Sequence, residues 1–215
     1  MPLDSKCKVC RRQGVKLFLR GERCFSPKCA MIKRPTPPGI KRKRRRGSLS
    51  EYGKELREKQ KLKAWYGLGE RQFKKYVKEI LNKTKRIQKE KEEDATQLLI
   101  KRLESRLDSV VFRMGIVSSR ALARQLVSHG YFRVNGRHVD IPSYRVKKDD
   151  QISIKPQKTK KKIFQNAVQF IKGQKSPEWL QVNPQTLEAK ILSDPILDVE
   201  SLPAEIPAIF EFYSR

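Results

Sequence analysis

The four cysteines of this 215-residue chain lie close together, in the basic stretch CKVCRRQGVKLFLRGERCFSPKC at residues 7–29. They form a C-x2-C pair and a C-x4-C pair, and two such pairs supply the four thiolate ligands that a tetrahedral zinc ion needs. A catalytic zinc site usually includes histidine, whereas the two histidines here, His129 and His138, lie far along the chain. The spacing therefore predicts one structural zinc ion, with these ligands: Cys7, Cys10, Cys24 and Cys29.

Two other uses of the four thiols remain open. An iron–sulfur cluster takes four cysteine ligands of the same kind. Two disulfides would also pair them, although the start MPLDSK has no apolar signal segment and so favours a reducing, cytosolic compartment. The segment has too few apolar residues for a core of its own, so a bound metal would supply much of its folding free energy.

The net charge of the chain predicts a polyanionic partner. Lys and Arg number 50 against 23 Asp and Glu, which gives a formal net charge of +27. Such an excess repels itself in a compact state unless an anion covers it, and nucleic acid is the simplest such anion. About half of it falls in residues 1–50, where the Pro/Gly-rich stretch PTPPGIKRKRRRGSLS is expected to order only against RNA. No run of about 18 apolar residues is present, which excludes a membrane span.

The rest of the sequence predicts mostly helices. Apolar spacing predicts helices over 51–66, 70–81 and 97–114, the first of them capped by Ser50. Residues 163–172 carry a shorter helical pattern. The terminal stretch IFEFYSR alternates as a short strand or an anchored tail would.

Residues 103–155 predict the most distinctive architecture. Ser118 or Ser119 caps a short helix, and Asn135-Gly136 between FRV and RHV is a type I′ hairpin signal. The stretch QISI alternates and adds a further strand. This part of the chain is therefore expected to pack two helices on a small antiparallel sheet.

Four stretches, in order along the chain, resemble the bacterial family of the fourth small-subunit ribosomal protein, in its zinc-bearing variant. VCRRQGVKLFLRGERCFSPKCA is similar to the zinc-bearing N-terminus found in part of that family, and LREKQKLKAWYGLGERQF to its central helices. LESRLDSVVFRMGIVSSRALARQLVSHGYFRVNGRHVDIPSYRVKKDDQISI resembles the small RNA-binding module named after the protein, and EFYSR its ending. Ile40 and Lys41 depart from the pattern, because the family commonly has glutamine and histidine there.

The resemblance implies an α+β fold in two domains. Residues 1–102 and 156–215 are expected to form a mostly helical domain, with a zinc knuckle at 1–34 and a basic extension at 35–50. The small module of two helices packed on an antiparallel sheet, residues 103–155, is expected to be inserted between them.

The resemblance also implies a structural, non-enzymatic role in the cytoplasmic ribosome. Such proteins bind the 5′ domain of small-subunit ribosomal RNA directly and nucleate subunit assembly. They lie near the messenger RNA entry channel, beside the third and fifth small-subunit proteins. Arginine binds phosphate through two parallel hydrogen bonds and lysine adds charge. The expected RNA contacts are Arg11, Arg12, Arg20 and Arg23 in the knuckle, Lys41, Arg42, Lys43, Arg44, Arg45 and Arg46 in the extension, Arg57, Lys61 and Arg71 in the central helices, and Arg106, Arg113, Arg120, Arg124 and His129 in the module.

Three other function classes fit the sequence less well. Pseudouridine synthases carry a similar module and a catalytic motif resembling Arg106-Leu107-Asp108, but no catalytic domain of sufficient size accompanies it here. A zinc-dependent DNA regulator would need a paired Cys–His finger or a recognition-helix motif. Membrane binding would need strongly apolar helix faces at the surface, whereas the core needs those faces here.

Overall fold

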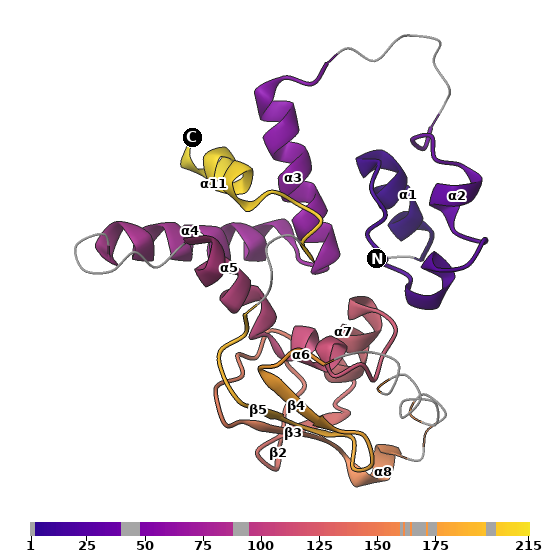
Figure 1. Ribbon diagram of the computed structural model, residues 1–215, viewed down its shortest axis with the longest axis vertical. Helices are drawn as coiled ribbons and strands as arrows, with labels where there is room; N and C mark the ends of the chain where they lie inside the picture. The colour runs from indigo at the N-terminus through magenta and orange to yellow at the C-terminus, as the bar shows by residue number, and fades with distance from the viewer. Residues whose placement is uncertain are drawn as a thin grey trace. The chain divides into compact units, whose positions relative to one another are not determined.

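The computed structural model describes residues 3–39, 48–87, 95–159, 161, 164, 171, 176–196 and 201–215 of the chain (Figure 1). The chain separates into two compact units, one of residues 1–99 and 198–215 and the other of residues 100–197. Both ends of the chain thus contribute to the first unit, as the resemblance implied. The predicted helix at 163–172 lies mostly outside the described residues, and the basic run 41–46 lies wholly outside them.

The cysteine segment is built from short helices joined by turns. They are α1 (Leu3–Gln13), the 3-10 helix η1 (Gly21–Cys24) and α2 (Ala30–Lys33). α1 ends where Gly14 adopts a φ of 71° and donates its N–H to the carbonyl of Cys10 at 2.9 Å. Helical geometry places residues three apart on one face, so Cys7 and Cys10 project from the same side of α1.

Two longer helices follow in the first unit, α3 (Glu51–Trp65) and α4 (Glu70–Ile87). The predicted cap of α3 is confirmed, because the Ser50 hydroxyl accepts a hydrogen bond from the Gly53 N–H at 3.3 Å. α4 runs on to Ile87, beyond the apolar pattern at residues 70–81. Its apolar stripe ends there while the helix runs on through polar residues, and a stripe reports only the buried part of a helix.

The C-terminal stretch forms a helix, α11 (Ile206–Ser214), so the expectation of a strand is wrong. Ile206 and Ile209 are fully buried, and their spacing of three residues fits a helix face rather than a strand face. α11 packs on α3 and α4, where the ring of Phe212 lies 5.4 Å from that of Tyr52. The Tyr213 ring lies 6.2 Å from that of Phe73 in the same interface.

Glu70 at the start of α4 connects this helix to α3 and α11 through hydrogen bonds. Its carboxylate accepts hydrogen bonds from Lys59, Lys63 and Tyr213, each at 2.8 Å. Burial alone would raise the pKa of Glu70, but these three donors outweigh it and lower the pKa from 4.5 to about 2. Burial and the hydrogen bond to Glu70 raise the pKa of Tyr213 in turn. The ionised form of Glu70 therefore stabilises the contact between α4 and α11.

Glu70→Gln is expected to lower the free energy of unfolding by about 1 kcal/mol at neutral pH, a modest value because the Glu70 side chain is 44% exposed to solvent. The folded-state pKa lies below the unfolded value, so ionised Glu70 stabilises the fold above pH 4.5. That contribution disappears as the pH falls from 4.5 towards about 2. Urea unfolding across this range should show a weaker pH dependence for the variant than for the parent.

The matched control is Glu211→Gln, an exposed carboxylate on α11 itself. It should leave both the free energy of unfolding and its pH dependence nearly unchanged. Identical pH profiles for Glu70→Gln and the parent would contradict the role of Glu70.

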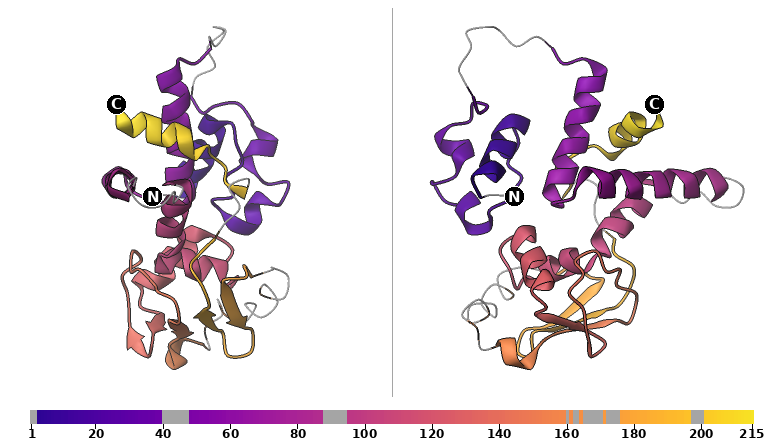
Figure 2. Two further views of the ribbon diagram at one scale, coloured as in Figure 1. Left: turned by 60° about the vertical axis from the view of Figure 1, so that its left-hand side comes forward. Right: turned by 180° about the vertical axis from the view of Figure 1, so that it is seen from behind.

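The second unit packs helices on an antiparallel sheet (Figure 2). The strand order is β2-β1-β3-β5-β4. Its buried core draws on α6, α7 and the strands, and includes Val110, Val127 and Phe132. The elements are α5 (Ala95–Glu104), which begins in the first unit, α6 (Leu107–Arg113), α7 (Arg120–Ser128), β1 (Phe132–Val134), β2 (Arg137–His138), β3 (Gln151–Ile154), α8 (Pro156–Thr159), β4 (Leu180–Asn183) and β5 (Glu188–Ile191).

The predicted hairpin between β1 and β2 is confirmed. Asn135 and Gly136 adopt φ values of 50° and 76°, as a type I′ turn requires, and Arg133 pairs with His138. Phe132 is fully buried on the face opposite to these two residues. The cap of α7 is confirmed as well, because the Ser119 hydroxyl accepts from the Leu122 N–H at 3.3 Å.

The boundary of the second unit corrects the predicted domain division. The prediction assigned 156–215 to the helical domain, whereas the structure places residues up to 197 with the module. β5 pairs with β3 and β4 pairs with β5, so two further strands extend the sheet. Trp179 and Leu180 are buried in the same core. An unpaired edge of β3 would leave backbone groups without partners, and these strands supply them.

The predicted helix over 97–114 is interrupted, which corrects that prediction too. α5 ends at Glu104, and Arg106 adopts an extended backbone conformation with φ −78° and ψ 140°. Arg106 forms an isolated bridge with Arg145, and the Leu107 N–H donates to the carbonyl of Tyr144 at 2.9 Å. The apolar spacing runs on through the break, so the sequence pattern gave no sign of it.

Candidate nucleic-acid interface and metal centre

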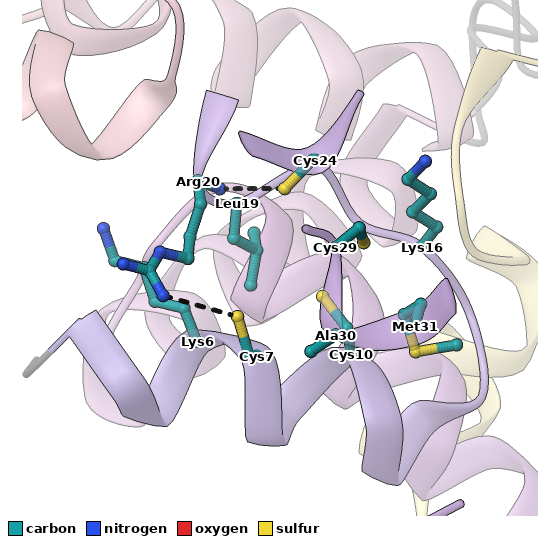
Figure 3. A pocket seen from close by; sticks show the side chains of 10 residues that line it. All are labelled: Lys6, Cys7, Cys10, Lys16, Leu19, Arg20, Cys24, Cys29, Ala30 and Met31. Carbon is teal, nitrogen blue, oxygen red and sulfur yellow. Dashed lines mark hydrogen bonds between the residues drawn. The ribbon is translucent and has the colours of Figure 1, made fainter. Parts of the chain in front are cut away.

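The four predicted metal ligands line one pocket (Figure 3). Cys7 and Cys10 come from α1, Cys24 ends η1, and Cys29 caps α2. All four cysteines are free. The structure thus brings together all four thiols that the spacing singled out.

Arg20 connects the two cysteine pairs. Its backbone N–H donates to the Cys24 Sγ at 3.4 Å, and its guanidinium Nη1 donates to the Cys7 Sγ at 3.7 Å (Figure 3). Such donors orient sulfur ligands. Arg20 was predicted to contact RNA, whereas its guanidinium is directed at a thiol here.

The donor set fits zinc in type and number, because four soft sulfur atoms face one site. Burial raises the pKa of the Cys10 thiol, and a backbone hydrogen bond from Leu17 partly offsets this. Among the described residues, no group of three or more Cys, His, Asp or Glu side chains is placed to hold a metal ion. The zinc knuckle therefore stays a prediction.

The other predicted contacts in the first unit divide by exposure. Arg12, Arg23 and Arg71 are exposed. The Arg11 Nε donates to the carbonyl of Thr36 at 2.8 Å, so this side chain fastens the start of the basic extension to α1. The remaining two, Arg57 and Lys61, are partly buried on α3, and Lys61 pairs with Glu58.

A buried carboxylate holds two of the predicted arginines in the module. Glu104 is fully buried, and its oxygens accept from the Arg113 Nε at 2.9 Å and Nη2 at 3.0 Å. The Arg120 Nη2 donates to the same carboxylate at 2.9 Å. The Arg120 guanidinium also lies 4.5 Å from the centre of the Phe112 ring. The side chains that project from α6 and α7 are therefore fixed in direction by one acid at the end of α5.

Arg106 is a correction to the predicted RNA contacts. Its side chain is fully buried, with Nε 2.9 Å from the Asp108 Oδ1 and Nη2 2.6 Å from Oδ2. A buried guanidinium cannot meet a phosphate at the surface, so its role is structural. Asp108 is itself buried, so this ion pair lies inside the module.

The module still presents positive charge at its surface. Arg124 is 41% exposed, with its Nη1 3.9 Å from the Asp108 Oδ2, and His129 at the end of α7 is exposed. Four guanidinium groups surround two buried carboxylates, so the cluster keeps an excess of positive charge. Sequence reasoning missed Glu104 as the organiser, because nothing in the spacing separates a buried acid from one in solvent.

Comparison with known proteins also divides the chain near residue 100. The family model "Ribosomal protein S4/S9 N-terminal domain" matches residues 3–99, and the model "S4 domain" matches residues 105–152. The protein named "Small ribosomal subunit protein uS4" of Thermus thermophilus is 43% identical over 209 residues, covering 97% of this chain and 96% of that protein. Its namesake in Thermodesulfovibrio yellowstonii is 44% identical over 211 residues, covering 98% and 97%.

A helical N-terminal domain followed by an S4 domain defines a class of ribosomal proteins. With this identity over nearly its whole length, the chain belongs to the uS4 family of small ribosomal subunit proteins.

Family membership decides between the function classes. The uS4 proteins are structural ribosomal proteins, which confirms the expectation that the chain is not an enzyme and excludes a synthase role for Arg106-Leu107-Asp108. Among the described residues, no helix combines the length and the apolar character needed to cross a membrane.

Proposed function

We propose that this chain is a structural component of the small ribosomal subunit and binds small-subunit ribosomal RNA directly. The observation that carries the proposal is the full-length match to proteins named small ribosomal subunit protein uS4. The excess charge of +27 supplies the chemistry, together with exposed guanidinium groups such as that of Arg124 on α7.

The finer proposal is that the chain binds the 5′ domain of that RNA and does so early in assembly. It then lies near the messenger RNA entry channel, with the third and fifth small-subunit proteins as neighbours in a cytoplasmic ribosome. Exposed arginines on separate elements, such as Arg12, Arg71 and Arg124, support recognition of several RNA backbones at once. RNA shape rather than base sequence is then the main determinant, because A-form grooves hide base edges.

The proposal includes one zinc ion held by the four cysteines that line the pocket. Bound zinc would supply the folding free energy that the few apolar residues of this segment lack. The chain's own contribution is to present Arg12 at the end of α1 and Arg23 in η1, beside the ligands.

Binding to a transcript of the 5′ domain, competed with bulk transfer RNA across a salt series, tests the proposed function. We expect tight binding that survives competition and weakens roughly a thousandfold between about 50 and 200 mM salt. Arg12→Ala should reduce the slope of log affinity against log salt by about one, because it removes one phosphate contact.

Lys148→Ala is the matched control, since Lys148 is an exposed cation outside the predicted contacts. It should leave both affinity and slope unchanged. If transfer RNA competes for the protein as well as unlabelled 5′-domain transcript does, the proposal is contradicted, because the binding then reflects generic cationic attraction alone.

A further inference from the structure

Two phenylalanines form an exposed aromatic surface beside the cysteine pocket. The rings of Phe18 and Phe25 stack at 5.0 Å between centroids with 30° between their planes. Phe18 is 42% exposed and Phe25 is 74% exposed. Burying these rings would stabilise the fold by several times RT, so leaving them in solvent forgoes a stabilisation that other aromatic residues of the chain obtain.

The backbone at this pair is strained at Phe18 and is held by hydrogen bonds at both residues. Phe18 has a φ of 51°, a left-handed conformation that is unusual for a bulky residue. Its carbonyl accepts from the Gly21 N–H at 3.3 Å, and the Phe25 N–H donates to the carbonyl of Glu22 at 3.0 Å. Both turns lie within the cysteine segment, so backbone hydrogen bonds hold the chain in place at each ring.

The surroundings of the pair are cationic. The Lys16 Nζ lies 5.1 Å from the centre of the Phe18 ring. Residues 7–29 contain Glu22 as their single acid, among seven lysines and arginines: Lys8, Arg11, Arg12, Lys16, Arg20, Arg23 and Lys28. An apolar protein surface would not complement this positive charge, whereas a nucleotide offers a flat ring for the aromatic side chains and a phosphate for the cations.

We infer that Phe18 and Phe25 form a stacking platform for an unpaired base of the ribosomal RNA, with the adjacent cations holding its phosphate. The inference rests on the proposed function and extends it, because it adds a contact to a base where the arginines contact only the backbone. Stacking on phenylalanine tolerates any base, so the platform selects an unstacked nucleotide rather than a sequence.

Phe25 is the residue to change, because its φ of −88° accepts any side chain, whereas a change at Phe18 would alter the strained turn as well. Phe25→Leu and Phe25→Ala are expected to bind the 5′-domain transcript about tenfold more weakly, and Phe25→Tyr within about twofold of the parent. The slope of log affinity against log salt should stay that of the parent, because no cation is lost. Ile32→Ala is the control, an exposed apolar residue of the same segment that carries no ring.

The outcomes separate this inference from the proposed function. Parent-like affinity for Phe25→Ala, with tight binding by the parent, overturns the platform and leaves the proposed function intact. Full affinity for Phe25→Leu, with a loss for Phe25→Ala, overturns stacking in favour of a plain apolar contact. Absence of specific binding by the parent overturns both. Circular dichroism spectra that match the parent establish that the variants are folded.

Discussion

Cys24→Ser is expected to abolish stoichiometric zinc binding and to weaken binding to the 5′-domain transcript by roughly a hundredfold, more than any single arginine substitution. Serine keeps the shape of the side chain but offers no thiolate. Without its fourth ligand the ion would not hold η1 against α1, and the elements that present Arg12 and Arg23 would lose their support. Several phosphate contacts would then be lost at once.

Metal content by mass spectrometry and RNA affinity at moderate salt are the two measurements. Ser26→Ala is the matched control, because its hydroxyl donates to the carbonyl of Arg23 within the same turn but is no predicted ligand. Arg23→Ala gives the cost of one cation alone. Zinc retained at one ion per chain, or RNA affinity equal to that of the parent, would refute the proposed metal centre.

Asp108→Asn is expected to destabilise the second unit by about 3–5 kcal/mol. The substitution removes the carboxylate that accepts two hydrogen bonds from the fully buried guanidinium of Arg106. A buried charge that loses its partner retains its full desolvation cost, whereas an exposed one is rehydrated. Urea unfolding followed by circular dichroism measures the loss, and Asp149→Asn is the control because that carboxylate is 67% exposed and pairs with Lys190 at 3.4 Å.

A double variant makes the test specific to the ion pair. Arg106→Leu with Asp108→Leu removes both charges and should recover much of the stability lost by either single change. If Asp108→Asn and Asp149→Asn destabilise the chain equally, the buried pair has no special role. If the double variant is no more stable than Asp108→Asn, packing rather than charge accounts for the loss of stability.

Local signals in the sequence predicted the parts of the fold that local interactions decide. The caps at Ser50 and Ser119 and the turn at Asn135-Gly136 each depend on a few adjacent residues, and all three are confirmed. The parts that failed depend on distant partners. β4 and β5 are stabilised by pairing with β3, and α11 is stabilised by α3 and α4, so their own short patterns could not reveal their state.

The candidate site shows the same division. Cysteine spacing predicted which four thiols would face one pocket, because spacing on a helix and around a turn constrains direction. The roles of the arginines could not be predicted, because Arg106, Arg113 and Arg124 look alike in the sequence. Their difference arises from Glu104 and Asp108, whose burial depends on the interruption between α5 and α6.

The packing of α11 on α3 has a consequence for the order of folding during synthesis. Glu55 pairs with Arg215 at 2.6 Å across 160 residues of sequence, and the whole second unit is synthesised between them. The second unit is continuous in sequence and can fold as soon as it leaves the ribosome that makes it. The first unit must wait for α11, so its helices leave the tunnel with an uncovered apolar face. A chain released before residue 206 therefore carries a finished module and an unfinished helical domain, a state that chaperones and proteases can recognise.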